Sequence, residues 1–112
     1  MSTVQSPVSD LLVTTKTREV QRGMLAEMRG DHERAARHFL AAAHLELVLV
    51  NDYAQAGQDD LSLRSRLSAA SCFWRAGQLE HARTHFDALV HDYPTRADSI
   101  QKVVEELAGR TT

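Results

Sequence analysis

Apolar residues recur along this chain at intervals of three and four, which is the spacing of one face of an α-helix. The first such pattern spans about residues 10–29 and includes Leu12, Val13, Val20, Met24, Leu25 and Met28. A second pattern runs from Asp31 to about Ala56, with Ala35, Phe39, Ala42 and Leu49 on one face. The alternation within 45–50 would also suit a β-strand. Because no turn residue interrupts the run from Asp31, we expect a helix there.

Three more helices are expected in the second half of the chain. Their apolar faces are formed by Leu63, Leu67, Ala70, Phe73 and Trp74, then by Leu79, Ala82, Phe86, Leu89 and Val90, and finally by Ile100, Val103, Val104 and Leu107. Asp59 or Asp60 is expected to cap the third helix, and the fourth should stop before Pro94. Thr95 followed by Asp98 resembles a capping box for the last helix, which should end near Gly109.

The boundaries between these helices are marked by glycine and by short capping residues. Gly30, Gly57 and Gly77 fall where helices should end in a left-handed turn. Asp31 can cap the helix that follows Gly30. Pro7 suits the first helical position, with Ser6 as its cap. Residues 1–8 are expected to form a frayed tail of a single domain that covers 1–112.

Composition and charge narrow the class of protein. The chain is 43% hydrophobic and 25% charged with a net charge of −2, which is typical of a globular domain. It has no basic stripe for nucleic acid, no secretory signal and no apolar run long enough for a membrane. The single cysteine, Cys72, excludes an intrachain disulfide and fits a reducing compartment. We therefore expect a cytoplasmic protein that binds neither nucleic acid nor membrane.

One segment of the sequence occurs twice. Gly30, Glu33, Ala35, His38 and Phe39 return 47 residues later as Gly77, Glu80, Ala82, His85 and Phe86. Self-similarity at a fixed period indicates stacked structural repeats, each of which buries its apolar face on its neighbour. The chain is therefore expected to contain two copies of one helical hairpin.

The spacing within each copy resembles the tetratricopeptide repeat. The matching residues are Gly23, Ala26, Gly30, Ala35, Phe39 and Ala42 in the first copy, and Ala70, Phe73, Gly77, Ala82, Phe86, Leu89 and the closing Pro94 in the second. The resemblance implies an all-α, right-handed solenoid of antiparallel hairpins with about five helices. Its units would be an extended first hairpin at 16–56, a second hairpin at 60–94 and a capping helix at 95–109.

The first copy departs from the family pattern in length. Its period is 47 residues instead of about 34. Leu47 stands where the closing proline of the family would fall, so the second helix should continue for about three turns. The aromatic residue usual early in the first helix is replaced by Glu19 in one copy and Arg66 in the other.

The resemblance also implies where a partner would bind. In this family the first helix of each hairpin lines a concave groove that receives a peptide or a helix. The corresponding positions here, with the arginines beside them, are Val20, Met24, Glu27, Arg64, Leu67, Ser71, Trp74 and Arg75. Val20 and Met24 occupy the places where some members carry a lysine and an asparagine that hold a terminal carboxylate, so that mode is not expected. Two repeats offer little concave surface, so the alternative is that these side chains form the core.

The extended helix provides a second candidate surface. Leu45, Leu47, Val48, Leu49 and Val50 cannot share one stripe, because successive residues turn by about 100°. A helix that is apolar on most sides must be covered on most sides. Either the N-terminal helix covers this segment or a second copy does, which makes it a candidate homodimer interface.

Catalytic chemistry has little support in the sequence. There is no phosphate-binding glycine loop, no nucleophile elbow and no zinc-protease motif. His81 and His85 lie one turn apart and could share a metal ion, but no third ligand is suitably spaced. Cys72 is expected to be a buried, unreactive thiol. We expect a protein–protein interaction module without catalytic residues, metal or cofactor, with a self-assembling subunit as the alternative and a metal-binding or enzymatic accessory protein as the third choice.

Overall fold

The computed structural model describes residues 7–111, apart from the side chain of Thr111, and the regular secondary structure in that range is entirely helical. The α-helices are α1 (Pro7–Met28), α2 (His32–Gln55), α3 (Asp59–Arg75), α4 (Leu79–Asp92) and α5 (Ala97–Thr111), with a short 3₁₀ turn η1 (Pro94–Arg96) before α5. No strand occurs among the described residues, so the segment 45–50 is helical, as expected. The fold class is all-α.

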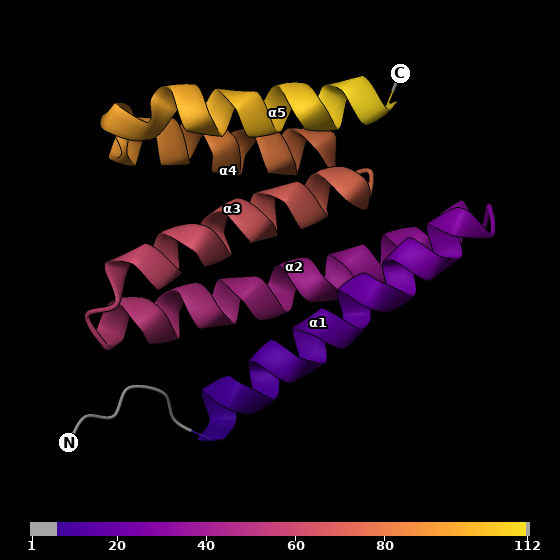
Figure 1. Ribbon diagram of the computed structural model, residues 1–112, viewed down its shortest axis with the longest axis horizontal. Helices are drawn as coiled ribbons and strands as arrows, with labels where there is room; N and C mark the ends of the chain where they lie inside the picture. Colours follow the sequence, from indigo (N-terminus) through magenta and orange to yellow (C-terminus); the bar gives the residue numbers. More distant parts are fainter. Residues whose placement is uncertain (1–6, 112) are drawn as a thin grey trace.

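Consecutive helices pack against one another in chain order, and α5 contacts both α3 and α4. Figure 1 shows α1 crossing α2 and α5 lying over α4, with α3 between the two pairs. The described part of the chain measures 47 × 32 × 17 Å. Because packed helices lie about 8–10 Å apart, the shortest dimension corresponds to two layers of helices.

The turns between the helices lie where the sequence predicts them. Gly30, Gly57 and Gly77 adopt φ values of 76°, 74° and 82°, which few other residues tolerate. The Asp31 side chain caps α2 by accepting a hydrogen bond from the Arg34 backbone N–H at 3.2 Å. The helix α4 ends at Asp92, before the proline.

Some helix boundaries differ from the prediction. The cap of α3 is Gln58, and both Asp59 and Asp60 lie inside the first turn, where their charge still favours the positive end of the helix dipole. Thr95 belongs to the 3₁₀ turn, so α5 starts later, at Ala97, and continues to Thr111. Within the tail expected at 1–8, Pro7 and Val8 are already helical, and the rest, with the proposed Ser6 cap, lies outside the described residues.

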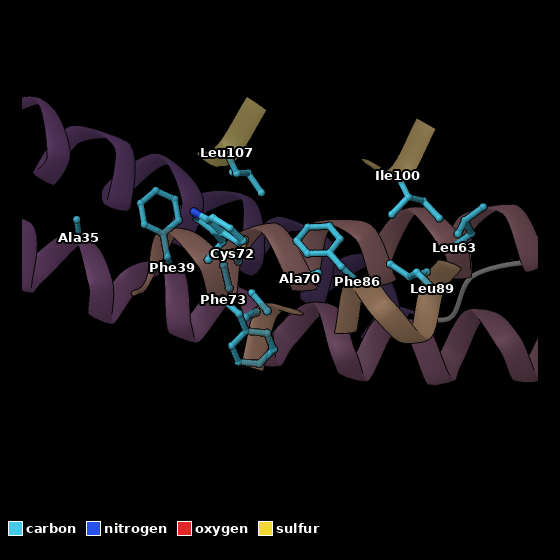
Figure 2. Close-up of a cluster of buried hydrophobic side chains, with 14 of the residues drawn as sticks. Ala35, Phe39, Leu63, Ala70, Cys72, Phe73, Phe86, Leu89, Ile100 and Leu107 are labelled. Atoms are coloured by element: carbon cyan, nitrogen blue, oxygen red, sulfur yellow. The ribbon is translucent and has the colours of Figure 1, made fainter. Parts of the chain in front are cut away.

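The core forms where the repeated residues meet. Phe39 and Phe86, which occupy equivalent positions in the two copies, are both buried, as are their equivalent alanines, Ala35 and Ala82. Figure 2 shows Ile100 and Leu107 extending from α5 into this cluster. The last helix therefore closes the end of the core that the second hairpin leaves open.

The segment 43–56 extends α2 to 24 residues, compared with 14 in α4. It is covered from two sides. On the α1 side, the Ser9 hydroxyl donates to the Asp52 carboxylate at 3.3 Å. On the α3 side, the Ser62 hydroxyl donates to the Val50 carbonyl at 3.1 Å. Leu49 is fully buried, whereas Val48 remains 48% exposed. The chain itself thus covers most of the extension.

Candidate functional site

A hollow next to the predicted groove residues lies between the C-terminal ends of α1, α3 and α5. This interhelix cleft has a volume of about 590 Å³ and is lined by Glu27, His32, Trp74, Arg75, Gly77, Leu79, Leu107 and Arg110. A smaller hollow of about 180 Å³ shares Arg75, Leu107 and Arg110 with it and adds Ser71, Val103 and Glu106. The two hollows therefore form one continuous depression along α3 and α5.

The cleft exists because α1 and α3 do not pack closely, since no Cα atom of one lies within 8 Å of the other. Arg75 spans this gap. Its Nη2 donates to Glu27 Oε1 at 2.8 Å, and its guanidinium carbon lies 4.2 Å from the centre of the Phe39 ring. The Arg75 side chain is 24% exposed, so its charge is held in place while remaining accessible from the cleft.

Trp74 forms an apolar wall of the cleft. Its side chain is largely buried, and Arg83 of α4 lies over its ring at 5.7 Å. Leu107 lies beside it in the cleft lining and is also buried. Trp74 also belongs to the buried core cluster, so it packs against the core as well as lining the cleft.

The structure gathers four of the eight predicted groove residues in this depression, namely Glu27, Ser71, Trp74 and Arg75. Val20 and Leu67 are partly buried against the core instead. Met24 and Arg64 are exposed but line neither hollow. The contribution of α5, through Leu107 and Arg110, was not predicted. The spacing of the apolar residues in 100–107 could have indicated this contribution, because an apolar helix face of that width requires a neighbouring helix to cover it.

The candidate metal pair, His81 and His85, is engaged in ring packing. Both imidazoles stack on the Phe73 ring, at centroid distances of 4.4 Å and 5.2 Å. His44 of α2 meets the edge of the same ring at 5.5 Å. Among the described residues, no group of three or more histidine, cysteine or acidic side chains is arranged to hold a metal ion. Stacking on Phe73 therefore accounts for these two histidines.

The pKa values of the partly buried His85 and the buried Cys72 differ from their ordinary values. Burial lowers the pKa of His85, and the nearby charges of His81 and Arg66 lower it further. Burial also raises the pKa of the Cys72 thiol to about 11, with a smaller contribution from the charge of Glu46. Both groups therefore favour their neutral forms at pH 7, and a neutral thiol is a poor nucleophile.

None of the described helices combines the length and the apolar character that a membrane crossing requires. Comparison of the chain with protein-family models, with curated proteins and with solved structures finds no match.

Proposed function

We propose that this chain is a tetratricopeptide-like interaction module of the cytoplasm that binds a helix or an extended peptide of a partner protein in the interhelix cleft. The proposal assigns it no catalytic activity and no cofactor. It is supported by the duplicated hairpin sequence and by the antiparallel packing of successive helices. In a right-handed solenoid, α1, α3 and α5 would hold the inner positions, and these three helices supply most of the cleft lining.

The observation that carries the proposal is the composition of the cleft. Apolar surface from Trp74, Leu79 and Leu107 lies next to the charged groups of Glu27, Arg75 and Arg110. Protein-binding sites combine an apolar centre with a polar rim in this way, because burial of the centre provides affinity and the rim sets orientation.

Leu79 is the best position to test, because it lines the cleft and is the first residue of α4. An acidic residue suits the first turn of a helix, so Leu79→Asp should preserve the fold. Affinity capture with the full chain as bait should recover partners that Leu79→Asp loses. The control is Lys102→Glu, a charge change on the exposed side of α5. Equal recovery by wild type and Leu79→Asp would refute the cleft as the binding site.

A self-assembling subunit is the alternative function, and Val48 is the observation that favours it. Of the five apolar residues in 45–50, Val48 alone is a largely exposed side chain, and Val8 and Leu11 of α1 are exposed as well. Light scattering at about tens of micromolar, a range in which weak dimers assemble, separates the two functions. A dimer that Val48→Asp dissociates without loss of helix would support self-assembly, and a strict monomer would exclude it.

A further inference from the structure

A second hollow lies at the closed end of the α1/α2 hairpin and shares no residue with the interhelix cleft. This hairpin-end pocket has a volume of about 530 Å³. Its chemistry comes from three arginines, one histidine, one acid and one leucine, namely Arg22, Arg29, Arg34, His38, Asp31 and Leu25. Positive charge therefore dominates its lining.

The carboxylates near this pocket do not neutralise it fully. Glu19 accepts a hydrogen bond from Arg22 at 3.1 Å and lies 2.9 Å from the His38 ring nitrogen. That contact with His38 lowers the pKa of Glu19, so this carboxylate stays ionised while it is shared between two partners. Arg34 pairs with Asp31 at 3.3 Å. Both arginine side chains are mostly exposed, and such pairs contribute little energy and exchange readily.

Arg29 has no such partner. Among the described residues it forms no ion pair, and the same is true of Arg18, three turns earlier on the same side of α1. Positions 18, 22, 25 and 29 are spaced by three and four residues and therefore form one stripe on the helix. The stripe is about 17 Å long. It presents three guanidinium groups around Leu25, and among the described residues only the middle one, Arg22, forms an ion pair.

Exposed apolar side chains lie next to this stripe. Leu25 is 48% exposed and Met24 is 46% exposed, while Met28, one turn further on, is 82% exposed. Three large apolar side chains at the solvent side of two adjacent helical turns exceed the scattered exposure usual for a surface. Methionine is flexible and adapts its shape to an incoming apolar surface. The stripe and these residues together form a basic surface with an apolar edge, which begins at Leu25 in the pocket lining and continues to the methionines outside it.

We propose that the hairpin-end pocket binds an acidic amphipathic helix of a partner protein. The leucines of such a helix would cover Leu25 and Met28, and its carboxylates would pair with Arg22, Arg29 and Arg34. A wholly apolar helix would bury the Arg29 guanidinium without a counter-charge, which is strongly unfavourable. A basic helix would be repelled by the same group. Of these three kinds of helix, only the acidic one satisfies both the apolar and the charged part of the surface.

The test uses the full chain and two labelled synthetic peptides of about 18 residues, or five helical turns. Each carries leucine at the three- and four-residue spacing, with glutamate at the remaining positions of one peptide and lysine in the other. The affinity of the glutamate peptide, measured by fluorescence anisotropy, should be at least about tenfold higher than that of the lysine peptide. This difference should shrink as the salt concentration is raised. Equal affinity of the two peptides would overturn the proposal.

Three variants locate the binding surface. Arg29→Glu should weaken binding of the glutamate peptide by about tenfold or more, because it inverts a charge that has no partner within the protein. Lys102→Glu makes the same charge change on α5 and should leave the affinity within about twofold. Leu79→Asp, which disables the interhelix cleft, should also leave the affinity for the glutamate peptide unchanged. Binding at the hairpin-end pocket and binding in the interhelix cleft can therefore fail separately. Full binding by Arg29→Glu, or loss of binding by Leu79→Asp, would contradict the assignment.

Anionic vesicles of phosphatidylglycerol serve as the competing probe. A basic surface with exposed methionines could attract anionic lipid through the same groups. Binding of the vesicles in preference to the glutamate peptide, with the same dependence on Arg29, would replace the proposed protein partner with a lipid surface. Absence of vesicle binding at an ionic strength where the peptide binds would support the helical partner.

Discussion

The backbone of Gly23 lies directly against the ring of Phe39. A β-carbon at position 23 would be 2.9 Å from both Cε2 and Cζ of that ring, which is closer than carbon atoms approach without displacement. The guanidinium of Arg75 lies 4.2 Å from the ring centre. Phe39 of α2 is therefore held between the backbone of α1 and a charged side chain of α3, and this contact joins three helices.

Gly23→Ala should destabilise the protein, although alanine favours helix formation. The substitution gains about 1 kcal/mol of helix propensity. Forcing a methyl group into a filled core costs about 1–3 kcal/mol. Because Phe39 is fully buried, its ring can shift only by displacing its neighbours, and we expect a net loss of about 1 kcal/mol in the free energy of unfolding measured in urea. Gly109→Ala is the matched control, since nothing lies near the position of its β-carbon. This control should be neutral or stabilising. A similar gain in the free energy of unfolding for Gly23→Ala would contradict the close contact with Phe39.

How far the sequence predicts this structure depends on the range of the interactions involved. The turns at Gly30 and Gly77 and the cap at Asp31 follow from residues a few positions apart, and they are confirmed. The repeat includes Gly23 among its matching positions, and the structure places the backbone there against the Phe39 ring. The burial of Glu46 was not predicted, since it depends on a lysine thirty residues earlier. The cleft was predicted in part, because Gly77, Leu107 and Arg110 of its lining belong to the turn before α4 and to the last helix.

Lys16 and Glu46 form an ion pair that fixes α1 on the extended part of α2. Lys16 Nζ lies 3.0 Å from Glu46 Oε2, and the Glu46 side chain is only 2% exposed. Within the described residues, Glu46 Oε1 has no hydrogen-bond partner. Loss of Lys16 would therefore leave a buried carboxylate without a counter-charge, which is far less favourable than removal of both charges.

Lys16→Met should lower the free energy of unfolding by about 2–3 kcal/mol, below the usual range for a fully buried pair because Lys16 is a quarter exposed. The double variant Lys16→Met/Glu46→Met should recover most of that loss, since it replaces both charges by apolar side chains. Urea denaturation of the two single variants and the double variant gives the coupling energy. Additive effects of the two substitutions would show that the pair does not contribute as a unit.

Cys72 should react slowly with thiol reagents in the folded protein. Burial raises its pKa to about 11, so the thiolate is scarce at pH 8. We expect the native rate with Ellman's reagent to be at least roughly a hundredfold lower than for an exposed cysteine, and denaturant should abolish the difference. The double variant Ser71→Cys/Cys72→Ser moves the thiol by one position to the lining of the smaller hollow. It should react faster, and equal native rates for the two positions would contradict the burial of Cys72.

The stability of the protein should decrease as the pH falls through the range in which His85 takes up a proton. Its pKa in the folded protein is lowered from the ordinary 6.5, mainly by burial and then by the charges of His81 and Arg66. The unfolded chain therefore binds the proton more readily than the folded chain. The contribution of His85 to stability is complete above pH 6.5 and is lost as the pH falls below it.

His85→Gln should flatten the dependence of unfolding free energy on pH between about 7 and 5, since glutamine does not titrate. His81→Gln should flatten it less, because it removes one cause of the lowered pKa while burial of His85 remains. Urea denaturation at several pH values gives both slopes, and far-ultraviolet circular dichroism at pH 7.5 shows whether each variant remains folded. If the unfolding free energy of His85→Gln depends on pH as steeply as that of the wild type, another group dominates the acid sensitivity and His85 does not control it.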